Sequence, residues 1–393
     1  MQNTQDTKDT KENLSLYKVI VLVLCAIVTI SSLYIMQPIQ PLLVDEFDIS
    51  ITQVTLFTSV VLFSLAIAPI FYGYLLEKFQ LRIILFLSLM AMGTFQSLLM
   101  FSPNFEVFLT LRILEALALP AALTATLTAM MRLDSKNIQK YIAIYVASTI
   151  FGGVLSRVGG GILTTIFSWE VTFLVLGLST LCLGFFVLRF LRDDSKIQSA
   201  RITTKAILEV FKDKRYILLY SGAFIVLFCF QGSLNFLPFE IKVLEPEISS
   251  AKIGFLYLGY IIGIITALFA GKIAYFLGTQ RAMVLGFVIF GVAPLIMLLH
   301  SFWWLFISVF VLCIGMFITH SLLSVLTNSL STQKRGITNG LYLAFYYMGG
   351  SIGTTFPSYL YHHYGWGFLC VFMSIILFFG AFVFLRFKIL FNG

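Results

Sequence analysis

Long apolar runs, separated by short polar segments, make up most of this chain. A helix needs about 20 mostly apolar residues to cross the hydrocarbon core of a bilayer. Twelve runs approach or exceed this length, at residues 17–38, 52–76, 82–101, 106–131, 139–165, 170–191, 217–239, 253–276, 282–300, 303–329, 337–360 and 366–387. The pattern therefore predicts an all-α membrane protein with twelve transmembrane helices.

Composition strengthens the membrane assignment. Hydrophobic residues fill 59% of the 393 positions, charged residues only 11%, and the mean hydropathy is +0.96. A soluble domain carries about 25% charged residues to solvate its surface. The first 16 residues are polar and predict a disordered cytoplasmic tail, with no secretory signal before the first helix. The cysteines occur singly inside apolar runs, so we expect neither disulfides nor a metal site, and no cofactor.

An internal repeat divides the chain into similar halves. The segment YVASTIFGG at residues 145–153 returns as YLAFYYMGG at residues 342–350, and the Ser-Trp at 168–169 returns as Gly-Trp at 365–366, both at a spacing of 197 residues. In a membrane chain such a repeat is typical of transporters. The repeat predicts a first six-helix half at residues 17–192, a cytoplasmic linker at 193–215 and a second half at 216–393. Gly152, Gly153, Gly349 and Gly350 are expected to let helices pack closely.

The distribution of charge predicts the orientation. If the chain starts inside, 22 of its 26 lysine and arginine residues fall in the tails and in the loops expected to be cytoplasmic. Basic residues near helix ends are retained on that side. The opposite loops are acidic, with Asp45, Glu46, Asp48, Glu106, Glu170, Glu240, Glu245 and Glu247. Both termini are therefore expected in the cytoplasm, and the net charge of +8 reflects topology and not a nucleic-acid surface.

The loop between the second and third runs resembles a known signature. GYLLEKFQLR at residues 73–82 resembles the Gly-x-Leu-x-Asp-Arg-x-Gly-Arg-Arg sequence of the major facilitator superfamily, with Glu77 for the Asp and Lys78 for the first Arg. The resemblance implies two pseudo-symmetric six-helix halves that work by alternating access. It also implies that Gly73, Glu77, Lys78 and Arg82 form a conformational latch. The alternative is that these charges serve only the positive-inside rule.

Two further segments resemble the drug/proton antiporter branch of this superfamily. Leu109, Arg112 and Glu115 follow its Leu-x-x-Arg-x-x-Gln-Gly pattern, with Glu115 at the Gln position. Glycines at 152–153 and 159–161 are similar to its glycine-rich antiporter motif, which normally contains a Gly-Pro pair that this chain lacks. The resemblance implies a monomeric efflux protein of a bacterial inner membrane.

Three charged residues lie deep inside predicted helices, away from the helix ends. Arg112, Glu115 and Arg157 each cost about 2.5–3.5 kcal/mol at the bilayer centre, so such residues usually have a function. Arg112 and Glu115 share a helix face, and Arg157 lies at a similar depth, so we expect all three to meet. The hypothesis is that protonation of Glu115 releases Arg112 or Arg157 to bind a polar or anionic substrate group. The alternative is a static buried salt bridge.

Uncharged polar residues at membrane depth are candidates to line a central cavity. They are Tyr34, Gln37, Gln231, Asn235, His320, Asn328 and Tyr346. His320 is also a candidate for a proton path. Such side chains serve equally often as hydrogen bonds between helices.

The sequence as a whole predicts a secondary transporter that exports small amphipathic or drug-like molecules with proton coupling. Proton-coupled uptake of a small organic anion is the first alternative, and a nontransporting membrane sensor or scaffold is the second. We expect a small-molecule substrate, protons and lipid as partners. No nucleotide-binding loop, paired-histidine metal motif or nucleophile elbow is present in the sequence, so an enzyme is not expected.

Overall fold

The computed structural model describes residues 2–134, 137–191, 204–330 and 335–387, and within these ranges every regular element is a helix. The first set of helices precedes residue 192. It comprises α1 (Gln2–Tyr34), η1 (Gln37–Ile39), α2 (Gln40–Phe47), α3 (Ile51–Lys78), α4 (Leu81–Leu98), η2 (Leu99–Phe101), α5 (Phe105–Leu133), α6 (Ile138–Ile166) and α7 (Trp169–Phe190).

The second set follows residue 203. It comprises α8 (Thr204–Phe211), α9 (Lys214–Leu234), α10 (Leu237–Leu244), α11 (Ser250–Leu256), η3 (Tyr257–Tyr260), α12 (Ile261–Leu277), α13 (Thr279–Ile296), η4 (Met297–Leu299), α14 (Phe302–Ser329) and α15 (Arg335–Arg386). The predicted linker therefore contains a helix, α8, and the rest of it up to residue 203 lies outside the described residues.

The predicted all-α membrane architecture is confirmed. Within the described ranges, eleven helical segments are long and apolar enough to cross a membrane. The last of them covers 51 residues and joins two of the predicted runs. It bends at Gly365, whose φ of 78° and ψ of 177° lie outside the helical region, in a conformation that favours glycine. This turn separates the eleventh and twelfth predicted helices without an intervening loop.

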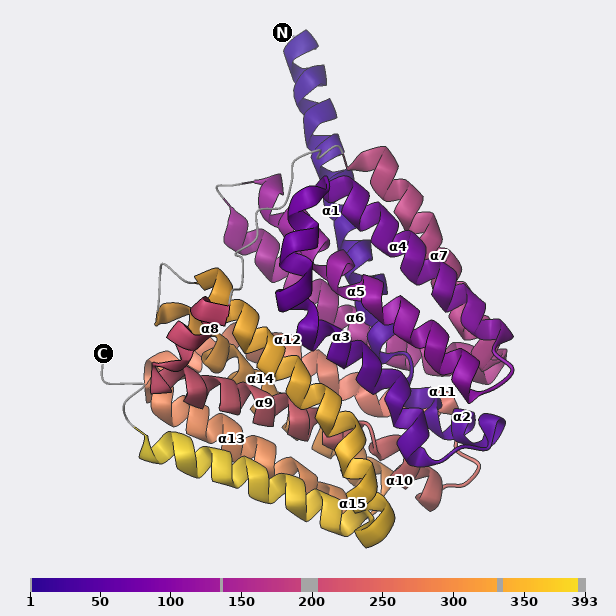
Figure 1. Cartoon of the computed structure of the whole chain (residues 1–393), viewed down its shortest axis with the longest axis vertical. Helices are drawn as coiled ribbons and strands as arrows, with labels where there is room; N and C mark the ends of the chain where they lie inside the picture. The colour runs from indigo at the N-terminus through magenta and orange to yellow at the C-terminus, as the bar shows by residue number, and fades with distance from the viewer. Residues whose placement is uncertain (1, 135–136, 192–203, 331–334, 388–393) are drawn as a thin grey trace.

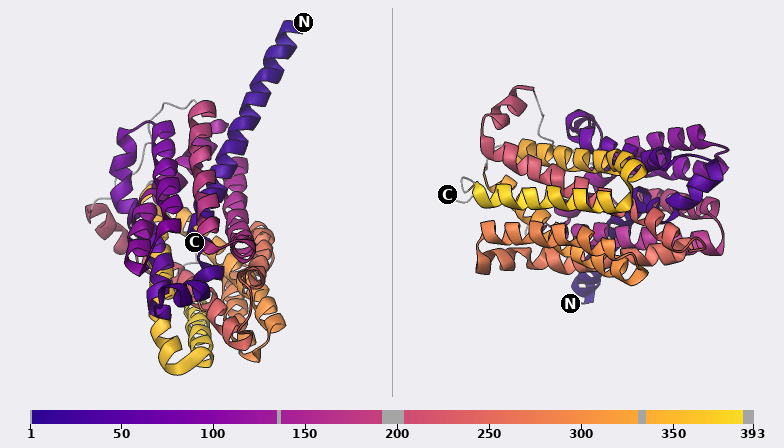
Figure 2. Two further views of the ribbon diagram at one scale, coloured as in Figure 1. Left: turned by 90° about the vertical axis from the view of Figure 1, so that its right-hand side faces the viewer. Right: turned by 90° about the horizontal axis from the view of Figure 1, so that it is seen from below.

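The N-terminal segment differs from the prediction. Helix α1 begins at Gln2, so the backbone of the polar segment expected to be a disordered tail is helical. Elongation adds a hydrogen bond for each residue fixed and needs no new nucleus, so a stable membrane helix favours helical structure in the residues before it. Figure 2 shows this end of α1 projecting beyond the rest of the molecule.

Short polar residues begin many of the helices. Ser50 accepts a hydrogen bond from the Gln53 N–H, and the Gln53 side chain accepts one from the Ser50 N–H, which completes a capping box at the start of α3. Single side-chain caps also start α5, α7, α9, α11 and α14, through Asn104, Ser168, Asp213, Ser249 and Ser301. The polar residues between apolar runs thus satisfy N–H groups that the first helical turn leaves free.

The helices form two bundles, which Figure 1 shows side by side. We call α1 to α7 the N-terminal bundle and α9 to α15 the C-terminal bundle. The sequence repeat has a structural counterpart in them. A Cβ on Gly152 would lie 2.7 Å from the Ile27 carbonyl oxygen, and one on Gly349 would lie 2.2 Å from that of Phe224. The two glycines and the two residues they contact are each 197 positions apart, so the same close helix crossing occurs once in each bundle.

Candidate functional site

A large cavity lies between the two bundles. Its volume is about 1220 Å³, and its walls come from α1, α3, α5 and α6 of the N-terminal bundle and from α9, η3, α12, α14 and α15 of the C-terminal bundle. It extends to Lys140 and Gly336, near the start of α6 and of α15, so it opens at that side of the molecule. We call this the open side, and the opposite side, where α6 ends, the closed side.

Three of the predicted cavity residues line this space, namely Tyr34, His320 and Tyr346. Most of the lining is aliphatic or aromatic, with a few hydroxyl groups between. The ring of His320 lies against that of Tyr346, at 4.4 Å between centroids and a tilt of 32°, and its Nδ1 lies 2.9 Å from the Tyr342 hydroxyl. The cavity therefore suits a molecule with a substantial apolar part.

The other four predicted cavity residues lie elsewhere. Gln37 and Asn235 are fully buried on the closed side, where Gln37 accepts a hydrogen bond from Arg157. Gln231 is also fully buried and outside the lining. The Asn328 amide donates to the Ser324 carbonyl at 2.9 Å. The sequence gives the depth of each residue along its helix but not the direction in which its side chain points, and this accounts for the difference.

Hydrogen bonds between α3 and α15 close the cavity on one flank. The Thr52 hydroxyl donates to Ser358 Oγ at 2.9 Å, and the Ser59 and Ser351 hydroxyls lie 2.9 Å apart. Each pair joins one bundle to the other.

A second group of contacts on the closed side involves α2 and α10. Lys242 forms an ion pair with Asp45 and donates to the Pro41 carbonyl at 3.3 Å. The buried amide of Gln40, on the same helix as Asp45, donates to Asn235 Oδ1 at 2.9 Å. These contacts also cross between the bundles, so the closed side is held by polar bonds as well as by apolar packing.

On the other flank the main chains of α6 and α11 touch. A Cβ on Gly161 would lie 2.3 Å from the Ser250 carbonyl oxygen, and one on Gly254 would lie 2.4 Å from that of Arg157. The Ala251 N–H also donates to Thr165 Oγ1 at 2.9 Å. Glycines are therefore required at this contact between the bundles.

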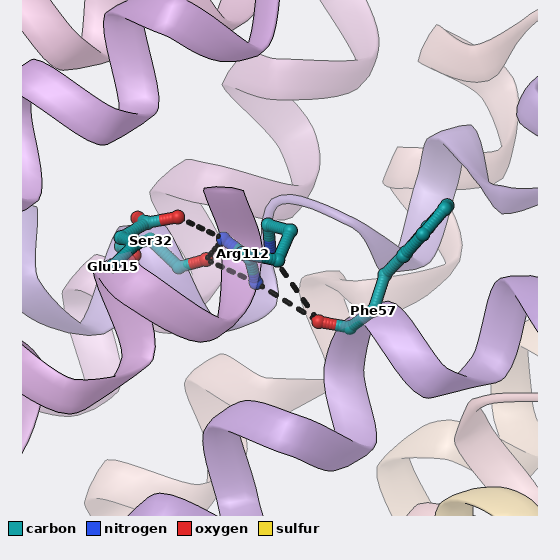
Figure 3. A network of polar contacts seen from close by, with 4 residues as sticks. All are labelled: Ser32, Phe57, Arg112 and Glu115. Atoms are coloured by element: carbon teal, nitrogen blue, oxygen red, sulfur yellow. Dashed lines mark hydrogen bonds and ion pairs between the residues drawn. The ribbon is translucent and has the colours of Figure 1, made fainter. Parts of the chain in front are cut away.

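The first of the two buried arginines is fully bonded within the N-terminal bundle. Arg112 on α5 donates to the Phe57 carbonyl at 3.2 and 3.3 Å, to the Ser32 carbonyl at 3.2 and 3.3 Å, and to Glu115 Oε2 at 2.6 Å (Figure 3). These bonds use all five N–H donors of its guanidinium. The Ser32 hydroxyl donates to the other oxygen of Glu115. The cluster joins α5 to α1 and α3, and all of its side chains are buried.

Arg157 on α6 has a different environment. Its guanidinium donates to Gln37 Oε1 at 2.5 Å, to the Gly153 carbonyl at 2.7 Å and to the Tyr260 hydroxyl at 3.0 Å. The rings of Tyr34, Tyr260 and Tyr257 surround it, with centroids 3.9, 4.1 and 5.2 Å from Cζ. The side chain is fully buried, and the described residues give it no carboxylate partner. Cation–π contacts with three rings replace an ion pair here.

The structure corrects the expected meeting of all three charged residues. Glu115 pairs with Arg112 alone, while Arg157 points toward η3 of the C-terminal bundle. Similar depth in the membrane does not bring two residues together when their helices present them on different faces. The sequence reasoning also missed Tyr257 and Tyr260, whose only signal was the presence of two tyrosines inside an apolar run.

The predicted latch stays largely a prediction. The side chains of Glu77 and Lys78, with Gly73, lie outside the described residues. Arg82 is half-buried near the start of α4. Gly350 also lies at a close contact, since a Cβ on it would lie 2.6 Å from a methyl carbon of Leu227, whereas the nearest atom of another helix to a Cβ on Gly153 would be 3.5 Å away, in Tyr34.

Two helical bundles around a cavity that opens to one side define a polytopic membrane transporter. The sequence model of the Major Facilitator Superfamily matches residues 22–274 and 241–390, and the chain belongs to this family. The inner membrane transport protein YnfM of Escherichia coli is 23% identical over 89% of this chain and 85% of that protein.

Solved structures show the same fold. A bacterial homologue of the human lysosomal transporter Spinster, in an inward-facing and unoccupied conformation, has a TM-score of 0.77 at 14% identity, over 96% of this chain and 98% of that one. The nucleoside transporter NupG has a TM-score of 0.81 at 13% identity, over 95% of this chain and 99% of that one.

Proposed function

We propose that this protein is a secondary active transporter that couples proton movement to the export of small amphipathic molecules by alternating access. The observation that carries the proposal is the mostly apolar cavity of about 1220 Å³ between the bundles. It is open at one side and sealed at the other by contacts that join the bundles. The charge distribution supports a cytoplasmic open side, with both termini on that side.

Glu115 is the proposed proton site, because the surrounding bonds accommodate both of its protonation states. The Ser32 hydroxyl donates to the ionised carboxylate, and the same hydroxyl can accept a hydrogen bond from a protonated one. If Glu115 becomes neutral, Arg112 keeps its four bonds to the Ser32 and Phe57 carbonyls. Protonation therefore leaves the guanidinium hydrogen-bonded, and its main effect is to weaken the ion pair between Arg112 and Glu115 within α5.

Proton-coupled uptake of a small organic anion is the second candidate. The buried guanidinium of Arg157, which has no carboxylate partner among the described residues, favours a substrate with negative charge. The direction of transport separates the two candidates.

The proposed function is tested by internal pH in proteoliposomes with an imposed proton gradient, while drugs and organic anions are added from one side. We expect substrate-dependent proton movement that Glu115→Gln abolishes. The matched control is Glu106→Gln, which changes an exposed carboxylate on the same helix and should leave proton movement unchanged. Proton movement that persists in Glu115→Gln would contradict the assignment of this residue. Antiport would indicate export and symport would indicate uptake.

A further inference from the structure

We infer that Arg157 is the anion-binding group of the transport site, and that the substrate carries a carboxylate or a similar single negative charge on an apolar, preferably aromatic, body. This inference rests on the proposed transport function, since it assumes that the cavity admits small molecules. Within the cavity it assigns a specific place and a specific charge to the substrate.

The first argument is the incomplete bonding of the guanidinium. Arg157 makes three hydrogen bonds to described residues, whereas Arg112 uses all five of its donors. Both side chains are fully buried. A buried cation without an anionic partner is expensive, and its surroundings stabilise it only through neutral oxygens and aromatic rings. An anion that reached Arg157 would complete its bonding.

The second argument is the position of Arg157 at the inner end of the cavity. Tyr34, Gly153 and Tyr260 line the cavity on one side and contact the guanidinium on the other. The position where a Cβ of Gly153 would stand is 3.1 Å from Nη1, so the lack of a side chain there leaves the guanidinium close to the cavity wall. Rotation of the two tyrosine side chains would open the path from the cavity.

A third observation is an unpartnered amide beside this group. Gln37 is fully buried, its Oε1 accepts from Arg157 Nε, and its Nε2 has no hydrogen-bond partner among the described residues. A buried donor without a partner is uncommon in folded proteins. The guanidinium and this amide therefore offer several unused N–H donors within one small region, which matches the two oxygens of a carboxylate. The tyrosine rings and the aliphatic cavity wall would contact the apolar body.

Occupancy of this site would also change a contact between the bundles. Tyr34 and Gln37 belong to the N-terminal bundle, while Tyr257 and Tyr260 belong to the C-terminal bundle. A carboxylate is a stronger acceptor for a guanidinium than the neutral Tyr260 hydroxyl that accepts from Nη2 at 3.0 Å. Binding would therefore compete with this bond between the bundles and weaken it, on the side that must open next.

The test compares 2-naphthoate with its uncharged carboxamide, 2-naphthamide, by titration calorimetry on the purified full-length protein at neutral pH. We expect the carboxylate to bind the unaltered protein about tenfold more tightly, because charge-assisted hydrogen bonds are about twice as strong as neutral ones. The preference should vanish in Arg157→Gln and decrease in Arg157→Lys, which keeps the charge but not the planar fork. Lys140→Gln removes an exposed cation at the mouth of the same cavity and should keep the tenfold preference.

Equal affinity of the two compounds for the unaltered protein would overturn the proposal without any variant. A preference that survives in folded Arg157→Gln, or is lost in Lys140→Gln alone, would also overturn it, since the anion would then be held elsewhere. Failure of this inference is distinct from failure of the proposed function. Proton-coupled transport of uncharged compounds without a carboxylate preference would refute only the anion site, whereas carboxylate binding without substrate-dependent proton movement would refute only the proton coupling.

Discussion

The Arg112 cluster allows a quantitative prediction about two substitutions that each remove one charge from the same ion pair. Glu115→Gln keeps an oxygen that can accept from Arg112 and leaves the other four bonds of the guanidinium in place. It replaces one charge-assisted hydrogen bond by a neutral one, which costs about 1 kcal/mol. Arg112→Gln instead removes the donor for two buried carbonyl oxygens and leaves the carboxylate without its cation, which costs about 3–5 kcal/mol.

The native cysteines of the chain can be used to measure its thermal unfolding. Among the five cysteines only Cys182 is exposed, so a fluorogenic maleimide reports the thermal exposure of the buried ones, including Cys25 on α1. We expect the unfolding temperature of purified Glu115→Gln to fall by a few degrees and that of Arg112→Gln to fall several times further. The double variant should recover part of the loss seen in Arg112→Gln, because it removes the unpaired charge.

Two outcomes would refute this reasoning. If Glu115→Gln is as destabilising as Arg112→Gln, Arg112 is stabilised mainly by the Glu115 carboxylate and not by the main-chain carbonyl groups. If the double variant is no more stable than Arg112→Gln, an unpaired carboxylate is not the source of the loss.

Two further predictions concern other parts of the molecule. Gly349→Ala should destabilise the protein by about 1–3 kcal/mol, because the new Cβ would lie 2.2 Å from the main-chain oxygen of Phe224. Gly271→Ala, whose Cβ would have no atom within 4 Å, should leave the unfolding temperature unchanged in the same assay. The hydrogen bonds from the Arg215 side chain lower the pKa of Asp213 at the start of α9. The pKa of the folded state is then below that of the unfolded state, so this stabilisation is complete above about pH 4 and is lost as the pH falls through the folded pKa. Asp213→Asn should therefore flatten the acid side of a plot of unfolding temperature against pH. An unchanged plot would contradict the role of this pair.

The helices could be predicted well because hydrophobicity is a one-dimensional signal. The apolar runs coincide with helical segments long enough to cross the bilayer, although the last segment covers two runs. The repeat also has a counterpart in the structure, because Gly152 packs on Ile27 as Gly349 packs on Phe224. The prediction was less complete for the N-terminal segment, which was expected to be disordered. The helical backbone before Leu16 has no apolar pattern of its own, and its order follows from continuity with α1.

The candidate site could be predicted only in part, because it depends on the rotation of each helix about its axis. The sequence identified Arg112, Glu115 and Arg157, which are fully buried, and placed them at similar depth. It could not show that Arg112 turns toward main-chain carbonyls of its own bundle while Arg157 turns toward Tyr260 of the other. Both directions are decided by tertiary packing, which local patterns do not encode.

The main-chain contact of α6 with α11 affects how well the protein prevents ions from leaking through the membrane. If a carrier has a water-filled cavity on one side and its barrier on the other side opens briefly, ions cross the membrane without substrate and the ion gradient is lost. Side chains change rotamer within nanoseconds, whereas packed backbones move only with whole helices. Because Gly161 and Gly254 bring backbone against backbone, this flank of the barrier does not depend on the rotamer of a side chain. On this flank, tightness against ion leak therefore depends on the packing of two main chains and not on the side chains that line the cavity.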